Sequence, residues 1–247
     1  MRSCISRDNR QVLLRDVAVA RRRRGEDDAL YPGAPRLLKH VDGADDVLLA
    51  VERRRLHRDV HLPIVESEPL HPMSFYGLSK VTVEHYLRLY QQSFGLDFVI
   101  LRFANVYGER QGNGGEGGVI SIFAQRLAEG KALAIYGDGE QTRDFIYAGD
   151  IAAGIYAALG TEHVNHAYNL STQTETSLKE LVAILADVSG KAIEPRYLEA
   201  RSGDIYKSML ANGRARRALG WAPAVSLHEG LRRTYDYFRM RAVQAKE

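Results

Sequence analysis

From about residue 60 onward, apolar residues recur with the periods of alternating helices and strands. Residues 75–94 place apolar side chains at three- and four-residue steps, with Gly95 just past them, which predicts a long helix. Residues 97–103, with the sequence DFVILRF, are typical of a buried strand. By the same criteria we expect further helices at residues 119–129, closed by Gly130, and 151–159, and further strands at 133–136, 145–147 and 168–170.

Two capping boxes mark the starts of later helices. Ser177 with Glu180, and Ser226 with Glu229, have the spacing in which each side chain caps the other residue's backbone N–H. Strands that alternate with helices predict an α/β fold with a mainly parallel sheet.

The first quarter of the chain lacks this regular pattern of apolar residues. Residues 1–58 contain the arginine runs 21–24 and 53–55, and only residues 11–20 and 47–51 are apolar enough for elements. The net charge of +3 divides unevenly, because residues 1–58 hold 14 Lys and Arg against 9 Asp and Glu, and the remainder holds 20 against 22. A nucleic-acid role would rest on the first quarter alone, which has no interleaved aromatics and no recognised binding module. We therefore expect no nucleic-acid partner.

The amino-acid composition also excludes several classes of protein. A single cysteine excludes a disulfide framework and a cysteine-based zinc site, and we expect no metal. No apolar run approaches the roughly 20 residues of a membrane span, and residues 1–30 have no apolar core of a secretory signal. We expect a cytoplasmic protein without a membrane partner.

Tyr76 and Lys80 are the first candidates for chemistry. Four residues apart on a helix, the two side chains share one face, and a nearby ammonium favours the phenolate form of tyrosine. Such a phenol can act as a general acid or base at a sugar hydroxyl. Taken without its surroundings, the pair is better interpreted as two surface residues of a helix.

The surroundings of this pair resemble a known family. The segments that carry the resemblance are HPMSFYGLSK at 71–80 with Glu84, LRFANVYG at 101–108, YGDG with Gln141 and RDFIY at 136–147 with Asp150, YNLS at 168–171, and RSGD at 201–204. In this order they are similar to extended short-chain dehydrogenases/reductases, in the branch of nucleotide-sugar epimerases and dehydratases, most like the UDP-glucose 4-epimerase type. The resemblance implies a Rossmann-like parallel sheet, truncated at the N-terminus, with a smaller C-terminal substrate-binding α/β domain. It also implies NAD as cofactor, a nucleotide sugar, most simply a UDP-sugar, as substrate, and a homodimer formed through the Tyr76 helix, whose expected outer stripe is Tyr86, Leu87, Leu89, Tyr90 and Phe94.

The resemblance assigns roles position by position. Tyr76 would be the catalytic acid/base, with NAD taking a hydride from the sugar C4, and Lys80 would hold the nicotinamide ribose; Phe103 joins both as a cofactor contact. The implied substrate contacts are Asn105 and Val119 at the diphosphate, Ala134 and Tyr136 beside the base, Arg143 and Arg201 at the phosphates and Asp204 at the ribose. Arginine suits phosphate because its guanidinium offers two parallel donors.

Simpler interpretations stand beside these roles. Asn105 could cap or turn its loop, Arg143 could form a surface ion pair with Asp144, and Tyr136 could be a core aromatic; for Tyr107 the core reading is the one we favour. Residues 112–117 match G-x-G-x-x-G, but they follow Tyr76 in sequence, so we interpret them as a flexible loop before the substrate helix rather than a dinucleotide fingerprint.

The N-terminal part departs from the family. Residues 1–58 contain no glycine fingerprint, are too few for several βαβ units, and offer no hydroxyl about two dozen residues before Tyr76, where residues 51–54 lie. The likeness begins near Asp59, so a wrong reading frame, a mis-set start and a divergent N-terminus are all open hypotheses. The expected organisation is an atypical segment at 1–58, the remainder of the NAD-binding domain with the Tyr-Lys helix at 59–110, and mainly the nucleotide-sugar-binding domain at 111–247, with some segments returning to the first.

Three functions remain open. The favoured one is NAD-dependent epimerisation of a nucleotide sugar through a transient keto sugar. A dehydratase or decarboxylase on the same scaffold is the second, although the sequence offers no acid/base pair beside the missing hydroxyl. The third is a non-catalytic remnant that lacks the dinucleotide fingerprint, and in that case we expect the chain to bind NAD poorly.

Overall fold

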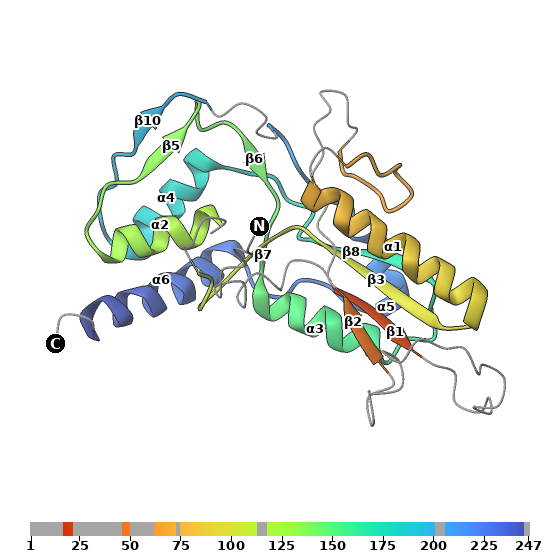
Figure 1. Ribbon diagram of the computed structural model, residues 1–247. Coiled ribbons are helices and arrows are strands. Elements are labelled where there is room, and N and C mark those ends of the chain that lie inside the picture. The colour runs from red at the N-terminus through yellow and green to blue at the C-terminus, as the bar shows by residue number, and fades with distance from the viewer. Residues whose placement is uncertain are drawn as a thin grey trace, which may run out of the picture.

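The computed structural model describes residues 17–21, 46–49, 62–72, 75–112, 118–200 and 206–244. Helices and strands alternate along these residues, which confirms the predicted α/β fold (Figure 1). The helices are α1 (Phe75–Phe94), α2 (Val119–Ala128), α3 (Ala148–Leu159), α4 (Leu178–Ser189), α5 (Gly213–Leu219) and α6 (Leu227–Gln244). The strands are β1 (Val17–Arg21), β2 (Asp46–Leu49), β3 (Asp97–Phe103), β4 (Asn105–Tyr107), β5 (Ala134–Tyr136), β6 (Thr142–Arg143), β7 (Phe145–Tyr147), β8 (His166–Leu170), β9 (Thr176–Ser177) and β10 (Arg196–Leu198).

The largest sheet has the strand order β2-β1-β3-β8. β3 and β8 are parallel, with Val99 opposite His166 and Phe103 opposite Leu170, and every residue of β3 is buried. Parallel neighbours need a long crossover, and here the chain passes through α2 and α3 between the two strands. β1 and β2 are antiparallel to their neighbours, so the strands from the first quarter of the chain do not continue the parallel pattern.

Three short two-stranded sheets complete the described fold. β5 pairs with β10 and β4 with β7, both in parallel, whereas β6 and β9 are antiparallel. In Figure 1, β5 and β10 lie with α2, α4 and α6 on one side, and α1, α5 and the large sheet lie on the other. Between α2 and α3 the chain passes through β5, β6 and β7, from the first group of elements towards the second.

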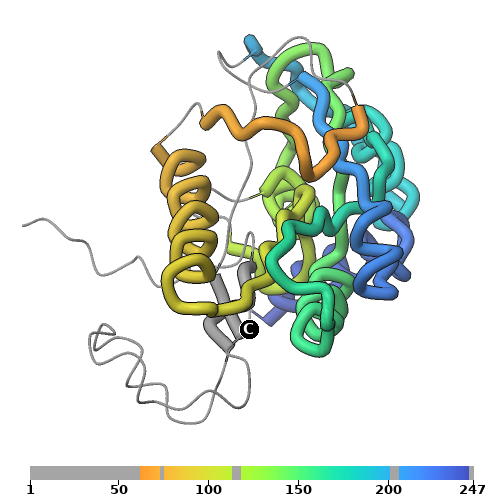
Figure 2. The backbone as a smooth tube through the Cα atoms, turned by 90° about the vertical axis from the view of Figure 1, so that its right-hand side faces the viewer, coloured from red at the N-terminus to blue at the C-terminus, as the bar shows by residue number. Residues whose placement is uncertain are grey.

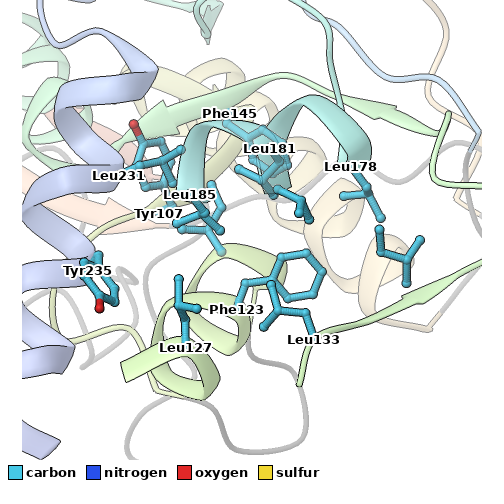
Figure 3. Packing of buried hydrophobic residues seen from close by; sticks show 13 residues of the cluster. Tyr107, Phe123, Leu127, Leu133, Phe145, Leu178, Leu181, Leu185, Leu231 and Tyr235 are labelled. Atoms are coloured by element: carbon cyan, nitrogen blue, oxygen red, sulfur yellow. The ribbon is translucent and has the colours of Figure 1, made fainter. Parts of the chain in front are cut away.

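A hydrophobic core joins α2, α4 and α6 (Figure 3). Tyr107 is buried in it, which confirms the interpretation of this residue as a core aromatic. Gly230 lies on α6 where a Cβ would come 2.1 Å from the Tyr107 hydroxyl oxygen, so only glycine lets the helix approach this closely. The Ser177–Glu180 capping box opens α4 as predicted, and Gly190 ends that helix with φ of +65°.

Helix α1 occupies the predicted residues and stands at one side of the described structure (Figure 2). Gly95 follows it in the left-handed region, and its N–H donates to the Gln91 carbonyl at 2.9 Å. Leu87 is buried against Phe98 and Ile100 of β3, so its place in the expected outer stripe was wrong. Successive residues of a helix point about 100° apart, so Leu87 faces the sheet while its neighbour Tyr86 points to solvent and is 58% exposed.

A buried ion pair fixes α1 on the sheet. The Arg102 guanidinium donates from Nε to Glu84 Oε1 at 2.8 Å and from Nη2 to Glu84 Oε2 at 2.7 Å. Both side chains are about 2% exposed, so each charge depends on the other for the polar contacts that water would provide. The third donor, Arg102 Nη1, reaches the carbonyl of Glu66 at 3.0 Å.

The same polar network binds residues 62–72 to β8. Glu66 Oε1 accepts the backbone N–H of Asn169 at 3.0 Å, and Asn169 Nδ2 donates to the carbonyls of Ile64 and Ala211. The segment that precedes α1 is therefore held by β3 and β8 together. None of the helices among the described residues is both long and apolar enough to cross a bilayer.

We expect Arg102→Gln to lower the free energy of unfolding by about 3–5 kcal/mol, because it leaves the Glu84 carboxylate buried without its bidentate partner. Arg88→Gln is the matched control: Arg88 contacts the same carboxylate from an exposed position at 3.6 Å, and its loss should cost under about 1 kcal/mol. Urea unfolding of the two variants measures the difference. Equal costs would show that the ion pair does not anchor the helix.

Candidate active site

Tyr76 and Lys80 lie in the first two turns of α1, and both are half-buried. Lys80 Nζ stands 5.0 Å from the centre of the Tyr76 ring, over its face. The helical spacing therefore brings the ammonium beside the phenol, as the sequence predicted. The Glu84–Arg102 ion pair follows one turn later on the same helix and sets its position on the sheet.

Phe103 and Asn105 lie where β3 ends. Phe103 is buried in the core between β3, α3 and β8, and Asn105 begins β4. The Asn105 backbone N–H and its Nδ2 both donate to the carbonyl oxygen of Asp144, at 2.8 and 3.3 Å. Asn105 is thus fixed by a residue of the β6–β7 connection rather than by its own loop.

Val119 is the first residue of α2. Gly118 precedes it in an extended conformation and provides no side-chain cap. The buried side of the helix, including Ile120 and Phe123, packs in the core shared with α4 and α6. The backbone at the start of α2 is thereby held in place while Val119 itself stays half-buried.

The expected base contacts lie on β5. Ala134 and Tyr136 are half-buried at the two ends of the strand, so Tyr136 is not a fully buried core aromatic. The turn that follows has Gly137 and Gly139 at φ of +87° and +81°, and Gln141 Nε2 donates back to the Tyr136 carbonyl at 2.6 Å. In Figure 1, β5 lies on the far side of β6 from α1.

Arg143 ends β6, half-buried, and its Nη1 donates to the carbonyl of Thr142 at 2.8 Å. The other predicted contacts, Arg201 and Asp204, lie outside the described residues, as do the glycines at 114, 115 and 117. The described residues on either side of 201–205 are held by backbone hydrogen bonds. The Leu198 carbonyl accepts from the Gly137 N–H, and the Tyr206 carbonyl accepts from the Thr142 N–H.

Sequence reasoning missed the part played by Asp144. Its carboxylate is 1% exposed and accepts from the Thr172 N–H and Oγ1, the Gln173 N–H and, at 3.4 Å, the Leu210 N–H. Burial raises the pKa of Asp144 to about 6, although these hydrogen bonds act in the opposite direction. A surface ion pair with Arg143 is therefore not its role. The signal in the sequence was an aspartate directly before the apolar run 145–147.

Within the described part of the chain, no three His, Cys, Asp or Glu side chains come together in a way that could hold a metal ion. The chemistry available at the described positions is that of a phenol with an adjacent ammonium, an amide at the end of β3 and a guanidinium on β6.

Comparisons with known proteins place this geometry in a class. The fold matches that of the UDP-glucose 4-epimerase of Thermotoga maritima, solved with UDP-glucose, with a TM-score of 0.72 and 39% identity over 75% of this chain and 60% of that one. In sequence the chain is 39% identical to a UDP-glucose 4-epimerase of Mycolicibacterium smegmatis, over 73% of this chain and 58% of the relative. It is also 30% identical to UDP-glucuronic acid decarboxylase 1 of Xenopus tropicalis, over 69% of this chain and 40% of the relative.

The fold is that of the Rossmann-type sugar-nucleotide epimerases. Residues 58–171 match the model of the NAD dependent epimerase/dehydratase family. The match begins where the likeness in the sequence was expected to begin, near Asp59. The chain spans about six tenths of the length of the Thermotoga maritima and Mycolicibacterium smegmatis proteins.

Proposed function

We propose that the chain, from residue 58 onward, carries the catalytic helix and the sugar-nucleotide-binding part of an epimerase of the UDP-glucose 4-epimerase type. The observation that carries this proposal is the Tyr76–Lys80 pair, with the ammonium 5.0 Å from the phenol ring, on a helix inside the family segment. Similarity to two UDP-glucose 4-epimerases, one of them solved with UDP-glucose, supports the substrate class.

The step that we assign to the chain's own residues is proton transfer at a sugar hydroxyl. Tyr76 accepts the proton of a sugar hydroxyl and later returns it, while the Lys80 ammonium stabilises the phenolate between the two events. The hydride that must leave the same carbon for a keto group to form would go to, and return from, a nicotinamide cofactor supplied from solution. Asn105, the start of α2 and Arg143 bind the diphosphate, and Ala134 and Tyr136 flank the base. Arg201 and Asp204 add phosphate and ribose contacts in this proposal.

A decarboxylase or dehydratase remains the second candidate. The 30% identity to UDP-glucuronic acid decarboxylase 1 of Xenopus tropicalis, over 69% of this chain, favours it. The family's hydroxyl, about two dozen residues before the tyrosine, has no counterpart in residues 51–54, so the sequence does not provide the site that would separate the two reactions.

The family is NAD-dependent, and the solved relatives include complexes with NAD. In this chain, Tyr76 and Lys80 suit the nicotinamide ribose, but the rest of the dinucleotide does not fit what precedes them. Residues 1–58 contain no glycine fingerprint, and β1 is antiparallel to both of its neighbours, whereas a dinucleotide-binding βαβ unit has parallel strands around a glycine turn. We therefore assign no step of this chain's chemistry to NAD.

Weak NAD binding follows from this mismatch. Each charge-assisted hydrogen bond to the pyrophosphate contributes about 1.5–3 kcal/mol, so the loss of two or three weakens binding by roughly 3–9 kcal/mol, or two to six powers of ten. We expect the 247-residue protein to purify without NAD and to show no micromolar binding by isothermal titration calorimetry. Micromolar affinity would mean that residues 1–58 build a nucleotide site of another kind.

Any interconversion of UDP-glucose and UDP-galactose by the chain, assayed at millimolar NAD, should fall by about 10²–10⁴-fold in Tyr76→Phe, because the variant lacks the acid/base oxygen. Tyr90→Phe is the control, since Tyr90 lies on the same helix against Phe94 and has no proposed part in proton transfer. Full turnover in Tyr76→Phe would contradict the assignment. No turnover in the parent, with UDP-glucose still bound, would instead support a binding remnant.

We also propose a homodimer formed through the outer face of α1, defined by Phe75, Leu78, Tyr86 and Leu89. At 100° per residue these four side chains fall within a narrow stripe, and each is at least half exposed, Phe75 at 94%. Exposed large apolar side chains that gather on one side of a surface helix are typical of a protein interface.

Sedimentation velocity at micromolar concentration tests the dimer. We expect the parent chain to be dimeric and Leu89→Glu to be monomeric, because a carboxylate would be buried without a partner in the interface. Tyr156→Glu is the matched control: Tyr156 is 80% exposed on α3, away from this face, and the variant should remain dimeric. A well-folded monomeric parent would contradict the proposal.

A further inference from the structure

Asp144 lies where the chain crosses between two parts of the fold. Arg143 before it pairs with Thr176 in the β6–β9 sheet, and Phe145 after it pairs with Asn105 in the β4–β7 sheet. The Asp144 peptide therefore joins β6, which carries Arg143, to β7, which pairs with the strand that carries Asn105. Its carbonyl oxygen holds Asn105 directly, through both the backbone N–H and Nδ2.

The side chain of Asp144 fixes this crossing from the other side. Oδ1 accepts from the N–H and hydroxyl of Thr172, at 3.0 and 2.7 Å, and Oδ2 accepts from the Gln173 N–H at 3.1 Å and the Leu210 N–H at 3.4 Å. Gln173 has φ of +58°, so the turn after β8 has an unusual backbone that the carboxylate holds in place. Three separate segments thus meet at one buried side chain.

We propose that Asp144 is a positioning residue for sugar-nucleotide binding, which sets Asn105 and Arg143 at the spacing that a diphosphate requires. The role rests on the proposed function, because it presumes that these two side chains bind the diphosphate. Asp144 acts through its neighbours and does not itself touch the ligand, since its side chain is 1% exposed.

The role depends on a carboxylate rather than on a side chain of that shape. Four donors converge on the two oxygens of Asp144, and a carboxylate accepts on both, whereas a carboxamide accepts on one. In Asp144→Asn, one oxygen becomes an NH₂ group that faces N–H donors of Thr172 or of Gln173 and Leu210. The turn or the crossing must then shift, and Asn105 moves with the Asp144 peptide to which it is bonded.

Asp150 provides a matched comparison on the adjoining helix. It is also buried, at 4% exposed, and its two oxygens accept the backbone N–H groups of Ala224 and Val225 at 3.0 and 3.1 Å. These contacts tie α3 to the segment before α6, and Asp150 bonds to neither Asn105 nor Arg143 in them. Asp150→Asn therefore makes the same chemical change at a buried aspartate outside the proposed binding site.

The test is isothermal titration of UDP-glucose into the full chain, its Asp144→Asn variant and its Asp150→Asn variant at pH 7.5, with unfolding curves to establish that each is folded at the titration temperature. We expect the affinity of Asp144→Asn for UDP-glucose to fall at least tenfold and that of Asp150→Asn to stay within twofold of the parent. Uridine, which lacks the diphosphate, should bind all three equally when followed by NMR titration. If Asp144 only stabilised the fold, Asp144→Asn would weaken the binding of UDP-glucose and of uridine alike.

Each outcome decides a different point. Equal UDP-glucose affinity of the two variants, or an equal loss of uridine binding in Asp144→Asn, overturns the positioning role while the proposed function stands. A parent chain that binds no UDP-glucose overturns the proposed function, and the positioning role with it.

Discussion

The buried Glu84–Arg102 ion pair is the interaction on which the placement of α1, the helix that carries Tyr76 and Lys80, depends. It links α1 to β3 by two charge-assisted hydrogen bonds, and the third donor of Arg102 extends the link to Glu66 and so to β8. Because α1 packs on the sheet through few apolar side chains, chiefly Leu87 and Val83, this polar connection fixes its height and rotation. The position of Tyr76 relative to the end of β3 follows from it, although the two lie in different elements.

The described fold places its candidate ligand contacts at the ends of strands and in the turns between them. Asn105 follows β3, Val119 follows the β4 loop, and Arg143 ends β6, while the cores beneath these elements consist of aliphatic and aromatic side chains. Such an arrangement keeps these candidate contacts at a half-buried surface and gives each a rigid support. Asp144 extends the same principle, because its buried carboxylate bonds its own segment to two others, residues 172–173 and Leu210.

Much of this could be predicted from local sequence. The 3.6-residue period and Gly95 determine α1, the uninterrupted apolar run determines β3, and the Ser177–Glu180 spacing determines the start of α4, because each signal lies within the element that it predicts. Leu87 was misplaced because apolar character alone does not tell which side of a helix meets the sheet. The antiparallel pairing of β1 and the part played by Asp144 depend on residues far away in the chain, so neither has a local signature. The division into domains and the catalytic, cofactor-binding and substrate-binding roles of all the candidate site residues remain predictions.

Gly230 shows how the two halves of the sequence constrain each other. Glycine in the middle of a helix lowers helix stability by about 1 kcal/mol relative to alanine, yet α6 keeps one where Tyr107 presses against its backbone. The residue at 230 and the aromatic at 107 therefore form a single steric unit separated by more than a hundred positions in the chain. A smaller side chain at 107 would remove the demand for glycine, so a larger residue at 230 is compatible with this fold only together with a smaller one at 107.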